Sequence, residues 1–216
     1  MPNTSLDTAS VQRPGAFLGK ITSAVRELAA RQVDLSAPGL ILDVGCGNGL
    51  LFAETKLVSG WSVGMDLDLE LLQEGRRVLS DNRIENACLV QGNAGDLPFR
   101  SGVFDSVFLL NTLINIPDDH VVRRFLDELI RVCRPEGRIF VDIRSRSNSY
   151  LRLKYWWHNR TADFRTRAYH ARELDGIFAA NGFRVVARHA VGSRLPFGPF
   201  SYLLEARRAP TVAVSD

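Results

Sequence analysis

Three glycines alternate with other residues directly after a short apolar run, in the stretch LDVGCGNGL at residues 42–50. Such a run is typical of a buried strand, and glycines let the backbone turn tightly and approach a ligand closely. A strand, a glycine turn and a helix in that order are the first part of a βαβ unit. This stretch constrains the chain most, because it favours an α/β fold that binds a ligand at the carboxyl ends of parallel strands.

Apolar runs and amphipathic segments alternate along the rest of the chain. Helices are predicted at 16–33, after the glycine turn at 50–58, at 67–82, at 118–133 with Asp118 or Asp119 as N-cap, and at 172–182, ending at Gly182. Strands are predicted at 40–44, 61–66, 87–92, 104–111 and 138–144. This alternation predicts a doubly wound, mostly parallel sheet.

The last two apolar segments, 184–191 and 201–208, are too close in sequence for a helical crossover. A short connection of this kind joins antiparallel strands. We therefore expect the sheet to end in an antiparallel hairpin.

Composition excludes several classes of protein. The 216 residues are 45% hydrophobic and 24% charged, which predicts a globular domain, and no apolar run approaches the ~20 residues of a membrane span. The first 15 residues lack the apolar core of a signal peptide and are expected to be a flexible lead. Three cysteines without metal-ligand spacing predict a reduced, cytoplasmic protein with no metal site. A net charge of +3 gives little support to nucleic-acid binding.

Two residues at the glycine turn distinguish between cofactors. In the dinucleotide fingerprint G-x-G-x-x-G a third glycine allows close packing beneath a pyrophosphate, but Leu50 stands at that position here. Asp43 places a carboxylate beside the turn, where it would repel a pyrophosphate and attract a cation. Asp66 follows Gly45 by 21 residues and suits the ribose hydroxyls of either kind of cofactor. The turn therefore favours S-adenosylmethionine, which carries an ammonium and a sulfonium, over NAD(P).

Five stretches of this sequence occur in the order and spacing of one family. They are ILDVGCGNG, VGMDLD, VQGNAGDLPF, FDSVFLLNTLINIPD and RVCRPEGRIFVDIR. The chain resembles the class I S-adenosylmethionine-dependent methyltransferases, in particular the small-molecule (type 11-like) branch. The resemblance implies seven strands with the last antiparallel, in a Rossmann-like sheet. It also implies a methyltransferase domain at 39–208, preceded at 1–38 by a lead and capping helix and followed by a tail at 209–216.

The resemblance also implies which residues bind the cofactor. Asp43 would orient the methionine ammonium, and Asp66 would hold the ribose. Asn93 stands where the family has an acid, and its carbonyl would accept from the adenine amino group. The residues expected at the cofactor are Asp43, Gly45, Cys46, Gly47, Gly49, Asp66, Leu67, Asn93, Ala94 and Asn111.

A basic, aromatic segment at about 145–170 follows the fifth predicted strand. From Arg144 to Arg172, both included, the chain has eight Lys or Arg and one acid, interleaved with aromatic residues. We expect it to cover an anionic or aromatic small-molecule acceptor, through Arg144, Arg146, Tyr155, Trp157 and Tyr169. Two other interpretations stay open: an interfacial helix on an anionic membrane, and simple packing.

Methyl transfer is an in-line displacement that depends mainly on placing the acceptor. A hydroxyl acceptor would also need a general base, for which His158 and His170 are the candidates. The expected function is transfer of a methyl group to oxygen or nitrogen of a small-molecule, sugar-like or secondary-metabolite acceptor. Two alternatives are an S-adenosylmethionine-binding partner subunit without catalysis, because LINIPD lacks the polar pair usual after the fourth strand, and an NAD(P)-dependent oxidoreductase.

Overall fold

A computed structural model describes residues 16–33, 39–55, 60–162, 165–192 and 197–210. The predicted lead at 1–15 and most of the predicted tail at 209–216 lie outside these ranges.

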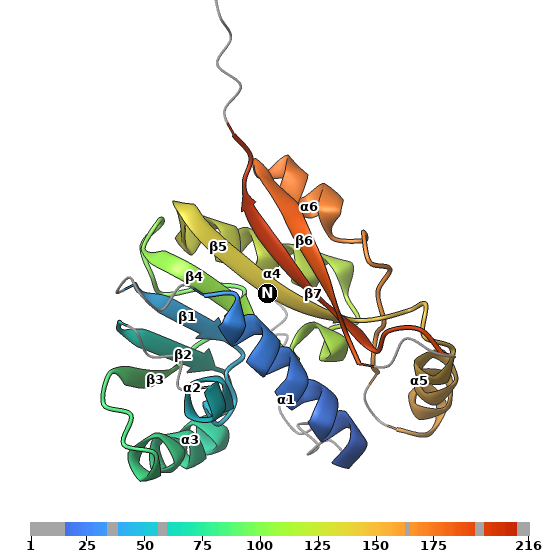
Figure 1. Cartoon of the computed structure of the whole chain (residues 1–216), viewed down its shortest axis with the longest axis horizontal. Coiled ribbons are helices and arrows are strands. Elements are labelled where there is room, and N and C mark those ends of the chain that lie inside the picture. The colour runs from blue at the N-terminus through green and yellow to red at the C-terminus, as the bar shows by residue number, and fades with distance from the viewer. Residues whose placement is uncertain (1–15, 34–38, 56–59, 163–164, 193–196, 211–216) are drawn as a thin grey trace, which may run out of the picture.

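The described strands form one sheet in the order β3-β2-β1-β4-β5-β7-β6 (Figure 1). They are β1 (Ile41–Val44), β2 (Ser62–Asp66), β3 (Ala87–Gln91), β4 (Phe104–Leu109), β5 (Cys133–Arg144), β6 (Phe183–Val191) and β7 (Ser201–Arg208). Strands β1 to β5 are paired in parallel, and β7 is antiparallel to both β5 and β6. The predicted fold class is confirmed: α/β, doubly wound, with seven strands and an antiparallel last strand.

Helices cover both faces of this sheet. They are α1 (Ala16–Arg31), α2 (Leu50–Thr55), α3 (Leu69–Asp81), α4 (Asp119–Val132), α5 (Ser149–Thr161) and α6 (Asp175–Ala180), with a 3₁₀ turn η1 (Leu113–Asn115) after β4. Figure 1 shows α1, α2 and α3 on one face and α4 and α6 on the other, while α5 lies at one end of the molecule. In the described residues, no helix is both long and apolar enough to cross a bilayer.

Alternation along each strand divides the buried side chains into two cores. In β5, Ile139 and Val141 join the core beneath α4 and α6, whereas Phe140 joins the core beneath α1, α2 and α3. The same alternation places Asp142 and Arg144 on the α1 side, both buried. The strand therefore carries two charged groups into the core at its carboxyl end, which is the end that forms the site.

Several element boundaries differ from those predicted. Strand β5 begins at Cys133 rather than Arg138, because Cys133 pairs with Phe104 before the register shifts at Ser106. Helix α6 begins at Asp175, after a turn, rather than at 172. The predicted N-cap of α4 is confirmed at Asp118, whose carboxylate accepts the N–H of His120 at 2.7 Å.

Candidate active site

The sheet order reverses beside β1, because β2 and β3 lie to one side of it and β4 and β5 to the other. At such a switch point the loops after two neighbouring parallel strands diverge and leave a crevice in which α/β proteins bind ligands. The glycine turn follows β1 and Asn111 follows β4, so both belong to this crevice. The site is therefore built first from these two connections.

All three glycines of the turn have positive φ, +73° at Gly45, +54° at Gly47 and +72° at Gly49. Other L-residues rarely adopt this conformation, which explains why glycine recurs at alternate positions. At Gly45 space is also limiting, because a Cβ there would lie 2.3 Å from Oγ1 of Thr112. The turn thus packs directly on the segment that follows β4.

Asp66, the last residue of β2, holds the turn in place. Its carboxylate accepts the N–H of Gly47 at 2.7 Å through one oxygen and that of Asp68 at 3.0 Å through the other. The carbonyl of Met65 accepts the N–H of Gly45 at 2.7 Å. The N-cap of α3 is Asp68, so Asp66 is left to face the turn, and each of its oxygens has a further lone pair for a ligand hydroxyl.

Asp43 is a buried carboxylate beside the turn, only 3% exposed. Its Oδ1 atom has no hydrogen-bond partner within the described residues. Burial, and to a lesser degree the negative charge of Asp66, raise its pKa to about 8, while the Arg26 guanidinium acts in the opposite direction. An unpartnered buried acid is costly unless a cation or donor reaches it. The residues at the turn therefore fit a ligand with an ammonium group and no phosphate.

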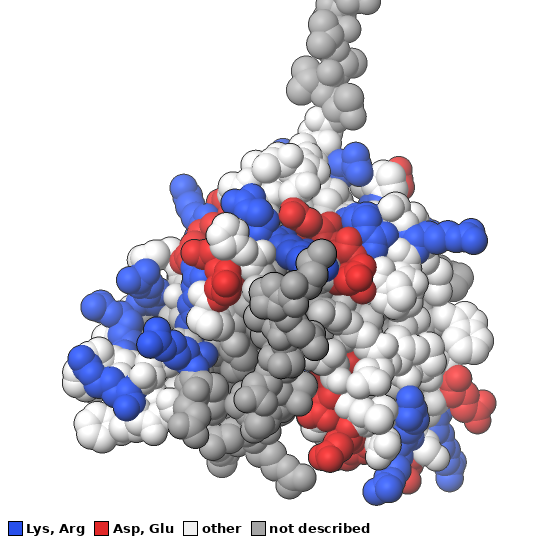
Figure 2. Space-filling model, turned by 180° about the vertical axis from the view of Figure 1, so that it is seen from behind, with Lys and Arg blue, Asp and Glu red and all other residues white. Residues whose placement is uncertain are grey.

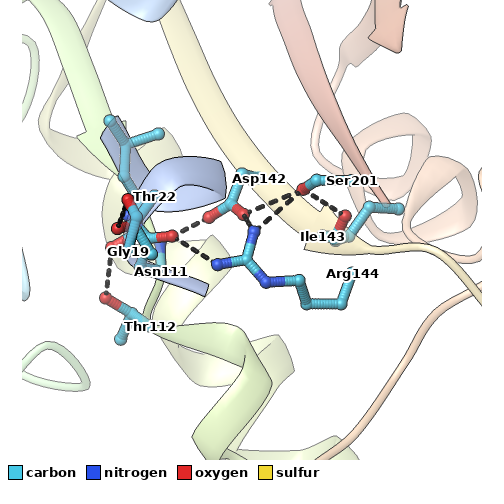
Figure 3. Close-up of polar contacts among 9 residues, drawn as sticks. Gly19, Thr22, Asn111, Thr112, Asp142, Ile143, Arg144 and Ser201 are labelled. Carbon is cyan, nitrogen blue, oxygen red and sulfur yellow. Dashed lines mark hydrogen bonds and ion pairs between the residues drawn. The ribbon is translucent and has the colours of Figure 1, made fainter. Parts of the chain in front are cut away.

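A buried polar network joins the carboxyl ends of β4 and β5 to the amino end of β7 (Figure 3). Arg144 donates to Oδ1 of Asn111 at 2.7 Å, to Asp142 at 3.0 Å and to Oγ of Ser201 at 3.2 Å. The hydroxyl of Ser201 donates to Asp142 at 3.1 Å or to the carbonyl of Ile143 at 2.8 Å. The other Asp142 oxygen accepts the backbone N–H of Asn111. Hydrogen bonds to Arg144 and Asp142 hold both the side chain and the backbone of Asn111, so the network fixes its position at the crevice.

Tyr155 brings helix α5 to this network. Burial raises the pKa of its hydroxyl to about 12, and the neighbouring Arg144 guanidinium acts in the opposite direction. The hydroxyl lies beside Arg144 without the geometry of a hydrogen bond, and the Nε–H of Arg144 has no partner either in the described part of the chain. The Tyr155 hydroxyl and the Arg144 Nε–H therefore lie together, both buried and both with unused hydrogen-bonding capacity. A polar atom of a ligand could bind to either group.

Helix α1 lies against the glycine-turn side of the site. Arg26 makes a two-pronged ion pair with Glu54 of α2, with both N–O distances 2.8 Å. The positive charge of the same guanidinium opposes the rise in the pKa of Asp43. The predicted helix at 16–33 is thus present over 16–31 and is anchored beside the turn.

Residues 41–137 match the family model described as a methyltransferase domain. This span contains the glycine turn, Asp66 and Asn111. The match is to a methyltransferase domain and covers a little under half of the chain. The resemblance found in the sequence is confirmed.

Relatives in sequence include two proteins named demethylmenaquinone methyltransferase. The protein of Shouchella clausii is 34% identical over 117 residues, 53% of this chain and 48% of the relative, and that of a Geobacillus strain is 32% identical over 117 residues. The chain thus spans about half the length of these relatives.

Solved structures with the same fold have lower identity. Magnesium protoporphyrin IX methyltransferase of Synechocystis, with bound SAH, has a TM-score of 0.71 at 18% identity and covers 92% of this chain and 90% of its own. The mitomycin 7-O-methyltransferase MmcR has a TM-score of 0.72 at 19% identity, over 90% of this chain and 56% of its own. At this identity the likeness establishes the fold.

The remaining residues predicted at the cofactor follow the carboxyl ends of β1, β2 and β3 and differ in their burial. Cys46 is buried, and burial raises the pKa of its thiol, as expected of a packing residue. Leu67 is exposed after β2. Asn93 is exposed, and its Oδ1 accepts the N–H of Gly95 at 2.9 Å, which leaves that oxygen one lone pair.

The residues predicted at the acceptor are divided between the site and the surface. Arg144 and Tyr155 come together, as described. Tyr169 is buried and donates to the carbonyls of Leu113 at 3.1 Å or Ile116 at 3.3 Å, so it fastens the segment after β4. Arg146 is exposed. Trp157 is 64% exposed and therefore lies on the side of α5 opposite Tyr155.

The two candidate bases differ in position. His158 is half-buried on α5, one turn after Tyr155. His170 is exposed, in the turn before α6, with its backbone N–H donated to Glu173 at 2.8 Å. Among the described residues no group of three or more His, Cys, Asp or Glu could hold a metal ion.

Four residues at the site were not predicted from the sequence: Arg26, Thr112, Asp142 and Ser201. A signal existed for one of them, because Asp142 interrupts an otherwise apolar strand, FVDI, two residues before Arg144. Charged residues at i and i+2 of a buried strand share a face and are rarely buried unless paired. Arg26 gave no such signal, because a lone arginine on an amphipathic helix is normally solvated.

Proposed function

We propose that this methyltransferase transfers a methyl group from S-adenosylmethionine to a small-molecule acceptor. The observation that carries the proposal is the buried, unpartnered Oδ1 of Asp43 beside a glycine turn that lacks the third dinucleotide glycine. The cofactor supplies a methyl group on a sulfonium, which leaves as the neutral thioether of S-adenosylhomocysteine.

The chain's own residues would bind and orient. Asp43 would accept from the methionine ammonium, and Asp66 would accept from the ribose hydroxyls while it keeps the N–H of Gly47. Asn93 and the amide of Ala94 would contact the adenine. The network of Arg144 and Asp142 would hold Asn111 rigid, which favours catalysis because the reaction depends on placement.

The acceptor would lie between Asn111, Arg144 and Tyr155. Arg144 Nε and the Tyr155 hydroxyl support this placement, because both are buried with hydrogen-bonding capacity to spare. Such groups suit an acceptor oxygen that carries partial or full negative charge. Where the acceptor is a hydroxyl, His158 is the better placed of the two candidate bases, because it is on the same helix as Tyr155.

Two acceptor classes follow. One is a hydroxyl- or amine-bearing metabolite, methylated at oxygen or nitrogen. The other is an apolar quinone-type acceptor, favoured by the relatives named demethylmenaquinone methyltransferase and by the exposed aromatic side chains of α5.

The first test is thermal unfolding with S-adenosylmethionine, S-adenosylhomocysteine and NADH. A ligand at a hundred times its Kd adds about 2.7 kcal/mol, or roughly 5 °C for a domain of this size. We expect both adenosyl ligands, and not NADH, to raise Tm, and we expect Asp66→Asn to lose most of the rise. A shift with NADH alone would refute the proposal.

The second test is transfer of a labelled methyl group to a panel of sugars, phenols, amines and reduced naphthoquinones. Turnover on any class identifies the acceptor. Tight cofactor binding without turnover on the whole panel would favour the alternative of a non-catalytic partner subunit.

A further inference from the structure

The outer face of α5 exposes large apolar side chains. Leu153 is 67% exposed, Trp157 64%, Trp156 53% and Tyr150 43%. Phe197, from the segment before β7, is also exposed, and its ring lies 6.4 Å from that of Tyr150. We call these five residues the α5 apolar face. They are more than half of the large hydrophobic residues exposed in the described part of the chain, so their grouping is a local feature rather than the ordinary scatter of apolar surface.

The opposite face of α5 is firmly attached to the protein. Leu151 and Tyr155 are buried in the core beneath α1. Asn148 caps the helix by accepting the N–H of Leu151 at 2.9 Å, and its amide donates to the carbonyl of Gly198 at 2.8 Å. The apolar face is therefore held outward by a fixed helix and is not the result of a frayed one.

Positive charge accompanies this face. Helix α5 carries Arg152, Lys154 and Arg160 and no acid. The guanidinium of Arg160 lies 3.8 Å from the ring centroid of Trp156, so cation and indole are presented together. In Figure 2 the edge formed by α5, at the lower left, shows Lys and Arg among uncharged side chains, without Asp or Glu between them.

We propose that the α5 apolar face docks on an anionic lipid bilayer surface. Tryptophan and tyrosine favour the headgroup region, leucine and phenylalanine enter the acyl boundary, and each flanking cation is attracted to acidic lipid. A second copy of this chain fits less well, because a two-fold contact would bring the cations of α5 toward one another.

The position of Tyr155 relates the membrane contact to the proposed acceptor site. Tyr155 lies on the inner face of the same helix, beside Arg144, while Trp156 is the next residue and faces outward. Docking would therefore place the acceptor site one helix diameter from the lipid. This step rests on the proposed function and favours an acceptor that resides in the membrane.

The test is sedimentation of the full chain with vesicles of phosphatidylglycerol or of phosphatidylcholine. We expect binding to phosphatidylglycerol that weakens with salt. Leu153→Ser/Trp156→Ser should lower the partition coefficient at least about tenfold, and Arg152→Gln/Arg160→Gln on the order of fivefold for each charge. The matched control is Trp61→Ser, because Trp61 is 62% exposed, lies directly before β2 and away from α5, and should not affect binding.

A spectroscopic readout uses the small number of tryptophans, three in the chain. In Trp61→Phe protein only the two indoles of α5 emit, and we expect their emission to shift to the blue with phosphatidylglycerol vesicles. No vesicle binding, equal binding by Leu153→Ser/Trp156→Ser, or a dimer in sedimentation velocity that this variant dissociates would each overturn the proposal.

The cofactor thermal shift, measured without vesicles, separates this inference from the proposed function. If the shift persists and vesicle binding fails, only the membrane inference falls. If vesicle binding persists and the shift is absent, only the proposed function falls.

Discussion

Arg144, the last residue of β5, donates to the side-chain oxygen of Asn111 at 2.7 Å. Asn111 lies two residues after the end of β4, so this hydrogen bond joins the ends of the two strands. Asn111 has a φ of +58°, which few residues other than glycine adopt. Asp142 completes the clamp by accepting the Asn111 N–H. A strained residue at the crevice is thus held from both its side chain and its backbone.

Arg144→Met should reveal the cost of breaking this clamp. The substitution keeps much of the volume but leaves Asp142 buried without its cation, so we expect the free energy of unfolding to fall by about 3–5 kcal/mol. Asp142→Asn/Arg144→Met should recover part of the loss, because no uncompensated charge remains. Urea unfolding of both variants measures this, and equal stability of the two would contradict the account.

Asp43→Asn should change both stability and its dependence on pH. In the free protein the carboxyl has a pKa of about 8, well above the roughly 4 of an unfolded chain. The folded state therefore binds the proton more tightly, and the free energy of unfolding contributed by this group falls as pH rises from about 4 to about 8. Removing the group should make the variant the more stable one at pH 8, by a few kcal/mol, with a smaller difference at pH 5. Chemical unfolding at the two pH values checks this.

The Asp43→Asn variant also tests the proposed contact between Asp43 and the methionine ammonium of the cofactor. We expect its affinity for S-adenosylmethionine to fall at least about tenfold, the order of a lost charge-assisted hydrogen bond. Titration calorimetry measures it. A variant that is more stable at pH 8 and still binds normally would show that Asp43 does not contact the cofactor.

Gly45→Ala should destabilise the turn for two separate reasons. The φ of +73° strains an alanine, and its Cβ would lie 2.3 Å from Oγ1 of Thr112, so we expect a loss of about 1–3 kcal/mol or more. Gly45→Ala/Thr112→Ala should restore only the steric part. The control is Gly176→Ala, since a Cβ there meets nothing within 4 Å. An equal loss at both glycines in thermal unfolding would refute the explanation.

Tyr155→Phe and Tyr169→Phe form a matched pair. The Tyr155 hydroxyl has no hydrogen-bond partner in the described structure, so its removal should leave the free energy of unfolding within about 1 kcal/mol of the original, or raise it. The Tyr169 hydroxyl bonds to backbone carbonyls, so its removal should cost about 1 kcal/mol. We expect Tyr155→Phe to lower kcat for methyl transfer with the cofactor Kd unchanged. Normal kcat would exclude the hydroxyl from the acceptor site.

The glycine turn and the order of elements were predictable because both are local. Alternating glycines after an apolar strand require only that the backbone turn tightly, and all three proved to have positive φ. The antiparallel end of the sheet followed from the short connection between 184–191 and 201–208. The family resemblance rested on five short stretches, which include the glycine turn and end at Arg144.

The buried network around Arg144 depended on tertiary structure. Asp142, Arg144 and Ser201 meet because β7 pairs with β5 in one register, Arg144 opposite Ser201, and sequence spacing does not encode that register. Tyr169 and Trp157 both lie in the basic, aromatic segment of the sequence. Tyr169 is nevertheless buried in the core, whereas Trp157 is exposed. The sequence by itself determined the fold and the glycine turn, through backbone constraints within a few residues. Only the folded chain decided which charges are buried together and which aromatic rings stay exposed, because burial depends on what distant segments pack against.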